Sequence, residues 1–365
     1  MFQLIIFVLV FFSLIEVFTG RKSRLWFNVA YILITFVAVF RYGQMDDYFS
    51  YYQYYENPDG YAEVDPLYGA ITNFFKSLSV SYVVFVSVMS FVCMAFAYRF
   101  FAIDCGASCL SLLIFYTYTF LLCCPLGAFR QGICLSILLF LYHRIKENRN
   151  KLFYFWVIVG CFIHLSFIVV LIIPTLMRLD IFNKSYIIYF VLGFIALAFT
   201  GLSIAQFLPF DRITYYEEGG GESMWLRMIL RILIIIPVIL YKPDYGTDGY
   251  YSKAICLVGF GLYCFLSFND LVAGRIEYYF RTFICLFAAY VVSNFKWKFR
   301  MGVQLCLLLS VHLILWFKNM SVEIERMYYR EGTTVLNFPF ISVFDKSELK
   351  EYSGIDTFGL DEGSD

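Results

Sequence analysis

Residues 126–142 read LGAFRQGICLSILLFLY, an apolar run that carries Arg130 and Gln131 near its start. Residues 152–174 read LFYFWVIVGCFIHLSFIVVLIIP and carry His164 in the middle. Ionisable side chains at membrane depth are costly, and they usually face a polar cavity or a functional site. The basic segment HRIKENRNK joins the two runs and marks the end that they share.

The two polar side chains lie at nearly equal spacing from this basic segment. Arg130 precedes Arg144 by about 14 residues and His164 follows Lys151 by about 13, so at about 1.5 Å per residue both lie roughly 20 Å from it. Two consecutive antiparallel helices would therefore hold a permanent cation and a titratable imidazole at one depth.

The composition places the chain in a membrane. It is 61 % hydrophobic and 15 % charged, whereas soluble domains carry about 25 % charged residues. Runs of about 20 apolar residues match a hydrocarbon core about 30 Å thick, so we expect an all-α, polytopic integral membrane protein with about 11–12 transmembrane helices. The formal net charge of zero indicates no class of partner, and we expect no nucleic-acid partner.

The apolar runs divide the chain into a polytopic transmembrane domain, 1–317, and a polar C-terminal tail, 318–365. The expected spans are 2–19, 25–40, 80–102, 107–123, 126–143, 152–177, 186–209, 224–241, 253–269, 274–295 and 301–317.

Three short basic loops orient these spans, because cytoplasmic loops carry an excess of Lys and Arg. They are 20–24 (GRKSR), 143–151 and 296–300 (KWKFR). With the first two in the cytoplasm, the amino terminus and the long loop 41–79 lie outside. The side of the tail is left open.

Five runs separate the second basic loop from the third, and an odd number cannot return the chain to the same side. At about 39 Å, the run 152–177 exceeds one bilayer crossing. We expect it to fold as two short helices that meet near His164, a break that is tolerated around a polar cavity. The alternative is a mistaken count elsewhere.

The external loop 41–79 interleaves tyrosines with carboxylates. Aromatic faces pack on sugar C–H faces and carboxylates accept hydroxyl protons, so the loop is a candidate glycan surface. The alternative is an aromatic belt at the membrane interface. Asp46 and Asp47 could also ligate a divalent cation, but no third ligand follows at a suitable spacing.

Later in this loop, Asp65 and Pro66 have the form of a helix N-cap followed by proline at the first helical position. Leu67, Tyr68, Ile71, Phe74 and Phe75 then recur at helical spacing. We expect a short amphipathic helix that lies on the membrane surface above a cavity.

Near the carboxyl-terminal end, 268–280 reads FNDLVAGRIEYYF. Arg275 shares a helical face with Tyr278 and Tyr279. If this segment begins a span from outside, Arg275 joins the outer cavity, and the alternative is an arginine that snorkels to the interface.

These pieces together resemble the EpsG family of bacterial membrane proteins, relatives of the Wzy-type O-antigen and exopolysaccharide polymerases. The matching features are Arg41 with Asp46, Asp47, Tyr48, Tyr51 and Tyr52; the element 65–68 (DPLY); 129–131 (FRQ); 162–166 (FIHLS); and Arg275 with Tyr278 and Tyr279. The family's usual E-P-G-Y is D-P-L-Y here, which puts a tight turn at that point in doubt.

The resemblance implies a GT-C-like or Wzy-like architecture in the bacterial cytoplasmic (inner) membrane. The implied activity joins oligosaccharide repeat units carried on undecaprenyl pyrophosphate at the outer face, without a nucleotide-sugar donor or another cofactor. The implied partners are the lipid-linked substrate, the growing glycan, membrane lipids and a chain-length regulator.

The residues at hand fit that chemistry. A guanidinium is always charged and contacts two phosphate oxygens at once, so Arg130 is assigned to the pyrophosphate, with Arg275 and Arg41 assisting. His164 is the general base on the acceptor hydroxyl, with Asp46 as the runner-up and an orienting hydrogen bond as the alternative role of His164. The expected substrate-binding residues are Asp47, Tyr48, Tyr51, Tyr52, Gln131, Tyr278 and Tyr279.

Two other functions remain open. A GT-C glycosyltransferase that uses a polyprenyl-phosphate sugar would add one sugar, but its acidic loop usually comes first, whereas here it follows the second span. A transporter or flippase of lipid-linked glycans would also hold Arg and His in a membrane cavity. Its sequence should show internally repeated halves, and none is visible.

Overall fold

The computed structural model describes residues 1–45, 47–57, 65–121, 126–184, 186–199, 224–267, 269–294, 299–326 and 332–349. Throughout these ranges the regular structure is helical, apart from one isolated β-bridge between Arg41 and Ser342. The expected all-α membrane class is confirmed. The helices long and apolar enough to cross a membrane are Phe2–Thr19, Tyr82–Asp104, Val272–Ser293 and Leu305–Glu325, and several shorter apolar helices accompany them.

The chain forms two compact units, Met1–Leu165 with Leu313–Asp365, and Ser166–His312. The helices of the first unit are α1 (Phe2–Thr19), α2 (Arg24–Phe40), α3 (Tyr48–Glu56), α4 (Pro66–Ser77), α5 (Tyr82–Arg99), α6 (Cys109–Ile114), α7 (Phe129–Lys146), α8 (Asn150–Cys161) and the last part of α15 (Phe299–Arg326). The π-helical turns Phe100–Asp104 and Phe115–Phe120 extend α5 and α6.

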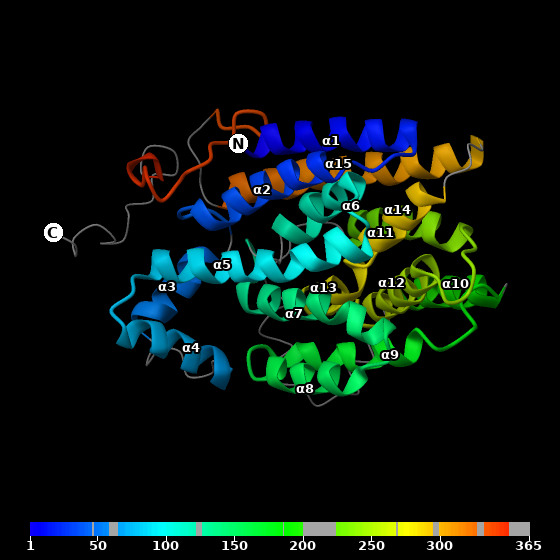
Figure 1. The fold of residues 1–365 in the computed structure, drawn as a ribbon, viewed down its shortest axis with the longest axis horizontal. Coiled ribbons are helices and arrows are strands. Elements are labelled where there is room, and N and C mark those ends of the chain that lie inside the picture. Colours follow the sequence, from blue (N-terminus) through cyan, green and yellow to red (C-terminus); the bar gives the residue numbers. More distant parts are fainter. Residues whose placement is uncertain are drawn as a thin grey trace. The chain divides into compact units, whose positions relative to one another are not determined.

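The first two helices form an antiparallel pair because a short polar turn joins them. Gly20 ends α1 in the left-handed conformation, with φ 65°, which glycine adopts without steric cost. The Ser23 hydroxyl then accepts the Trp26 N–H and caps α2. The two helices lie side by side, and α5 lies beside both α2 and α7 (Figure 1).

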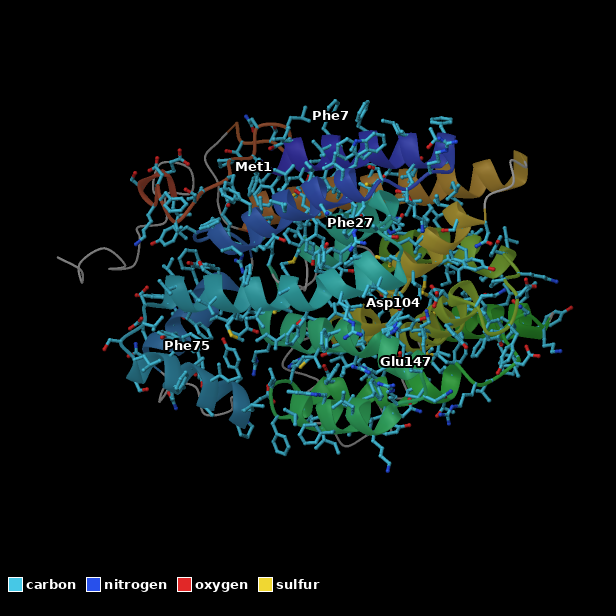
Figure 2. The ribbon with its side chains drawn as sticks, viewed as in Figure 1. Met1, Phe7, Phe27, Phe75, Asp104 and Glu147 are labelled. Carbon is cyan, nitrogen blue, oxygen red and sulfur yellow. The ribbon has the colours of Figure 1, made fainter. Side chains whose placement is uncertain are left out.

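Apolar side chains on the outer faces of these helices suit a lipid environment. Phe7 of α1 is 69 % exposed and points outward, whereas Phe27 of α2 is fully buried (Figure 2). Ile32, Phe91 and Ile158 are also exposed on their helices. An apolar surface of this kind marks contact with a membrane rather than with water.

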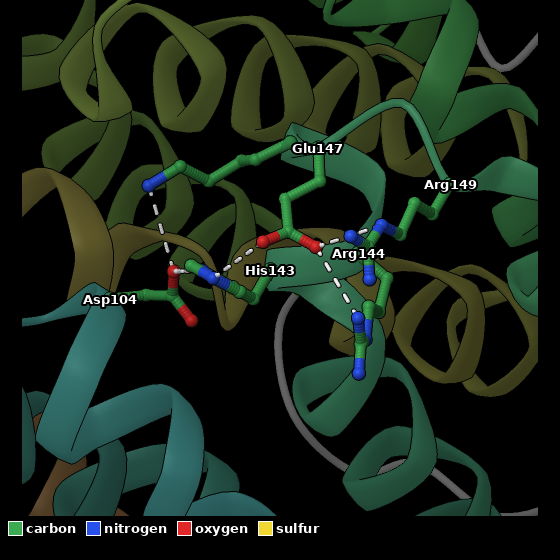
Figure 3. Close-up of polar contacts among 6 residues, drawn as sticks. Asp104, His143, Arg144, Glu147 and Arg149 are labelled. Carbon is green, nitrogen blue, oxygen red and sulfur yellow. Dashed lines mark hydrogen bonds and ion pairs between the residues drawn. The ribbon is translucent and has the colours of Figure 1, made fainter.

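The two basic loops of the first unit lie at one end of it. Lys22 donates to the Cys105 carbonyl at 3.1 Å. The buried Asp104 carboxylate contacts His143 Nδ1 at 3.3 Å and Lys146 Nζ at 3.6 Å (Figure 3). These contacts bring 20–24 and the end of α7 together, in agreement with the prediction that the two basic loops lie at one end.

The C-terminal segment 332–349 lies at the other end of the first unit. Gln3 Nε2, at the start of α1, donates to the carbonyls of Val335 and Phe338 at 3.0 and 2.9 Å. Tyr42 N–H donates to the Ile341 carbonyl at 2.9 Å. An 18-residue α1 separates this end from the basic loops by about 27 Å. The segment 332–349 therefore lies on the same side as the loop that follows α2. The sequence had left the side of this C-terminal tail open.

The long apolar run 152–177 is broken near His164, as the sequence predicted. Helix α8 ends at Cys161, and the amides of Ile163 and His164 both bond to the Gly160 carbonyl at 2.9 Å. From Leu165 the chain continues as a 3₁₀ stretch to Ile172 and then as the short α9. His164 therefore lies at the break itself.

The second unit consists of α9 (Ile173–Leu176), α10 (Tyr186–Phe199), α11 (Met224–Leu240), α12 (Asp248–Phe265), α13 (Asp270–Arg281), α14 (Ile284–Ser293) and the first part of α15. Helix α12 packs on α10, α11, α13 and α14. Gly259 allows the closest approach, because a Cβ there would collide with the Phe280 side chain of α13.

Several span boundaries differ from expectation. The run expected at 274–295 corresponds to the candidate span Val272–Ser293, in which a turn at Thr282 and Phe283 separates α13 from α14. The last helix, α15, continues to Arg326, beyond the expected end of the span at 317. Tertiary contacts hold the polar end of α15: Asn319 Nδ2 donates to the Thr117 carbonyl at 3.3 Å, and Glu323 Oε1 accepts from the Met45 N–H at 2.6 Å. Hydropathy alone does not register such contacts.

Candidate functional site

The Asp65 carboxylate lies between Arg130 and His164, the two polar residues of the apolar runs. Asp65 Oδ2 lies 2.8 Å from Arg130 Nη1 and 3.8 Å from His164 Nδ1. Three elements supply the group: the residue before α4, the first turn of α7 and the break after α8. The sequence predicted Arg130 and His164 at one depth, and in the structure both side chains lie within 4 Å of the same Asp65 oxygen atom.

Two aromatic rings flank the guanidinium. The Arg130 guanidinium carbon lies 5.9 Å from the ring centroids of Tyr51 and of Tyr68. The Arg130 backbone N–H also points at the Tyr51 hydroxyl, at 3.4 Å. Cation–π contacts of this length stabilise a guanidinium by about 0.5–2 kcal/mol each, more where water is excluded. The rings therefore hold Arg130 independently of Asp65.

A backbone hydrogen bond fixes α4 against the break. The Leu67 N–H, in the first turn of α4, donates to the Phe162 carbonyl at 2.9 Å. This carbonyl is free to accept because the helix α8 has ended. The bond sets the distance between Asp65, two residues before Leu67, and His164, two residues after Phe162.

Two nitrogen atoms of the group are unsatisfied. Arg130 Nε and His164 Nε2 are buried and have no hydrogen-bond partner among the described residues. The side chains of Arg130, Asp65 and His164 retain 26, 21 and 16 % exposure. Buried polar atoms normally find partners, so these two nitrogens are suited to bind a polar ligand, Arg130 Nε as a donor.

Asp65 does not play the part that the sequence suggested. It occupies the N-cap position with Pro66 at the first helical position, yet its carboxylate makes no capping hydrogen bond and turns to Arg130 instead. The expected amphipathic helix is present as α4, with Tyr68 and Thr72 as its buried residues. Leu67 continues this helix, so no tight turn requires a glycine there.

The tyrosine-rich segment after α2 is a helix, α3, rather than an open loop. Tyr48, Tyr54 and Tyr55 are buried on it, whereas Tyr51 and Tyr52 are half-buried. Burial raises the pKa of Tyr48 to about 12. These rings pack mainly on other aromatic rings, as Tyr48 does on Tyr82 with centroids 5.2 Å apart.

Arg41 is buried at the end of α2, 3 % exposed. Its Nη1 donates to the Gln44 carbonyl at 2.8 Å, and its guanidinium lies 5.4 Å from the Tyr48 ring centroid. Burial lowers the pKa of Arg41, and Tyr82, Tyr48 and the Glu323 carboxylate counter this effect.

The remaining expected residues are dispersed. Asp47 is at the N-cap position of α3, and Gln131 is buried on α7 beside Arg130. Asp46 lies outside the described residues. Within the described ranges, no group of three His, Cys, Asp or Glu side chains could hold a metal ion.

Arg275, Tyr278 and Tyr279 belong to the second unit. Tyr279 is buried, and its hydroxyl lies 3.4 Å from the Ser166 hydroxyl. Arg275 is half-buried on α13. The grouping of these residues with Arg130 stays a prediction.

Sequence reasoning missed an ion network in this second unit. Glu277 Oε2 accepts from Arg231 Nε at 2.8 Å, and Glu277 Oε1 lies 3.5 Å from Arg281 Nη1. The Arg231 guanidinium stacks on the Tyr263 ring, 3.7 Å from its centroid. The available signal was Arg231 within the apolar run 224–241, together with Glu277 and Arg281 one helical turn apart.

Comparison with known proteins adds one finding. The model of the EpsG family matches residues 24–330, a range that includes Asp65, Arg130 and His164. No curated protein and no solved structure matches the chain.

Proposed function

The chain belongs to the EpsG family, and from that membership we propose that it polymerises oligosaccharide repeat units carried on undecaprenyl pyrophosphate. Family membership supports a general role in exopolysaccharide biosynthesis. The helices make the chain a multi-pass membrane protein. The polymerase activity, the outer face of the bacterial cytoplasmic membrane as its place, and the lipid-linked substrate are parts of the proposal.

The observation that carries the proposal is the convergence of Arg130 and His164 on Asp65. The three side chains lie in the half of the first unit away from its basic loops. If those loops are cytoplasmic, the site belongs to the outer half of the membrane, where a lipid-linked glycan would meet it. A permanent cation beside an imidazole supplies both groups that a glycosyl transfer from pyrophosphate needs.

In the proposed step, the bond between the anomeric carbon and the pyrophosphate oxygen breaks. The electron pair of that bond stays with the pyrophosphate, whose added charge Arg130 neutralises. The acceptor hydroxyl oxygen forms the new glycosidic bond, and its proton passes to His164 Nε2. No nucleotide-sugar donor takes part.

The other expected residues take supporting roles in this proposal. Tyr51 and Tyr52 keep enough exposure on α3 to meet the glycan, whereas the buried Tyr48 supports their helix. Arg41, Asp47 and Gln131 lie in the same unit and act on the substrate less directly. Arg275, Tyr278 and Tyr279 belong to the second unit, and their part in substrate binding stays a prediction.

The deciding experiment uses purified protein and lipid-linked repeat units in detergent. We expect wild-type protein to form chains of many repeats. A single added sugar would indicate a GT-C transferase, and the absence of any product would favour a transporter, since detergent leaves no membrane to cross.

In the same assay, Arg130→Ala should reduce polymer formation at least about a hundredfold, the loss typical of removing one preorganised charge-stabilising group. Arg149→Ala is the matched control, because Arg149 is an exposed arginine at the basic end, with a side chain 65 % accessible. Polymer of normal length from the Arg130 variant would remove Arg130 from the mechanism.

A further inference from the structure

Asp65 binds Arg130 in the structure, yet the proposed reaction requires Arg130 to bind pyrophosphate. We propose that Asp65 is a substrate-responsive positioning residue: the pyrophosphate displaces its carboxylate from Arg130, and the freed carboxylate then orients His164 for proton transfer. This inference rests on the proposed function. It assigns to the site a coupling between binding and catalysis.

The geometry gives Asp65 two alternative partners within reach. Its Oδ2 atom is at hydrogen-bond distance from Arg130 Nη1, 2.8 Å, but at 3.8 Å from His164 Nδ1 it is too far for a hydrogen bond. A movement of roughly 1 Å would exchange one partner for the other. With Oδ2 held at hydrogen-bond distance from Arg130, its contact with His164 stays beyond that distance.

A pyrophosphate can displace the Asp65 carboxylate from Arg130. It carries more negative charge than one carboxylate and offers two oxygens to the guanidinium fork. Arg130 Nε already lacks a partner among the described residues. The Tyr51 and Tyr68 rings keep the guanidinium in place when the carboxylate leaves.

The released carboxylate determines which nitrogen of His164 serves as the base. A hydrogen bond from Nδ1–H to Asp65 places the remaining lone pair on Nε2. This is the buried nitrogen without a partner among the described residues. Before pyrophosphate binds, Arg130 holds Asp65 and His164 Nδ1 lies 3.8 Å from the carboxylate, so proton abstraction waits for the donor.

The test measures binding and turnover separately. Binding is measured with undecaprenyl pyrophosphate in detergent micelles, and turnover as polymer formed from lipid-linked repeat units. Asp65→Asn keeps the shape of the side chain and removes the negative charge. We expect its affinity for the probe to be unchanged or higher, because a competitor for Arg130 is lost, while turnover falls about a hundredfold or more, as on loss of general-base catalysis.

Companion variants separate positioning from a structural role. His164→Gln should bind the probe normally and lose turnover, and the Asp65→Asn/His164→Gln double variant should lose little more than His164→Gln alone, because the two residues act as one unit. Asp65→Glu restores a carboxylate and should recover part of the turnover. Asp345→Asn is the matched control, since Asp345 is exposed and its carboxylate accepts a hydrogen bond from the nearby Ser347 hydroxyl.

The outcomes are distinct. Weaker probe binding by Asp65→Asn, with turnover reduced in proportion, would mean that Asp65 merely supports Arg130, and the inference would be overturned. Wild-type turnover in Asp65→Asn, or losses that multiply in the double variant, would overturn it as well. If wild-type protein itself forms no polymer, the proposed function fails, and the inference fails with it. Unfolding temperatures in detergent identify any variant that has lost its fold.

Discussion

Two clusters in this protein place arginine against a carboxylate, and they differ in how completely the charges are enclosed. In the first unit, the side chains of Arg130 and Asp65 keep 26 and 21 % exposure. In the second unit, those of Arg231 and Glu277 keep only 10 and 3 %. The pair distances are equal, 2.8 Å in both, so distance does not distinguish the clusters.

The surroundings of the carboxylate do distinguish them. Glu277 lies between the guanidiniums of Arg231 and Arg281. The Tyr263 ring covers the Arg231 guanidinium, with its centroid 3.7 Å from the guanidinium carbon. Asp65 has one close arginine and one distant imidazole, and all three side chains keep some exposure. An enclosed network suits structural stability, whereas a partly open one suits exchange with a ligand.

The largest effect is expected from a substitution that breaks the enclosed network of Arg231, Glu277 and Arg281. Glu277→Ala leaves Arg231 and Arg281 without their shared carboxylate, and removing one partner of a buried ion pair costs about 3–5 kcal/mol. We expect a clearly lower unfolding temperature in detergent. Glu147→Ala is the matched control, because Glu147 is 37 % exposed at the basic end and its ion pairs there contribute little (Figure 3). An unchanged unfolding temperature for Glu277→Ala would contradict the proposal that this network stabilises the fold.

An intermediate effect concerns the open cluster. Arg130→Lys keeps the positive charge but loses the planar fork that contacts two phosphate oxygens. We expect turnover to fall about ten- to a hundredfold and the unfolding temperature to change little, the reverse of the Glu277→Ala result. Equal turnover with lysine would show that charge alone is sufficient at this position.

The smallest expected effect sharpens the role of the rings beside Arg130. The Tyr68 hydroxyl is buried without a hydrogen-bond partner among the described residues, and burial raises the pKa of Tyr68 well above its ordinary value. The hydroxyl therefore stays neutral and is no base. Tyr68→Phe removes a buried hydroxyl that has no partner among the described residues, so stability should be unchanged or up to about 1 kcal/mol higher and turnover should stay intact. Tyr68→Leu, in contrast, should weaken binding of the pyrophosphate probe. A large loss with phenylalanine would contradict the assignment to the ring.

Part of the candidate site could be derived from local sequence patterns. Arg130 and His164 stood out because each interrupts an apolar run, and helical rise placed them at one depth. The break at His164 followed from a run too long for one crossing. Asp65 was noticed, but as a capping residue, because the Asp-Pro pair is a strong local signal for a helix start.

The sequence by itself determined the all-α membrane class, the shared end of the two basic loops and the start of α4 at Pro66. Run length, loop charge and capping residues are properties of neighbouring positions, so they can be interpreted without a fold. The tertiary structure alone decided that Asp65 binds Arg130, that Glu277 pairs with Arg231 and that 332–349 lies beside the end of α2. Each of these contacts joins residues distant in the chain, and packing of the helices, rather than any local preference, brings their side chains within bonding distance.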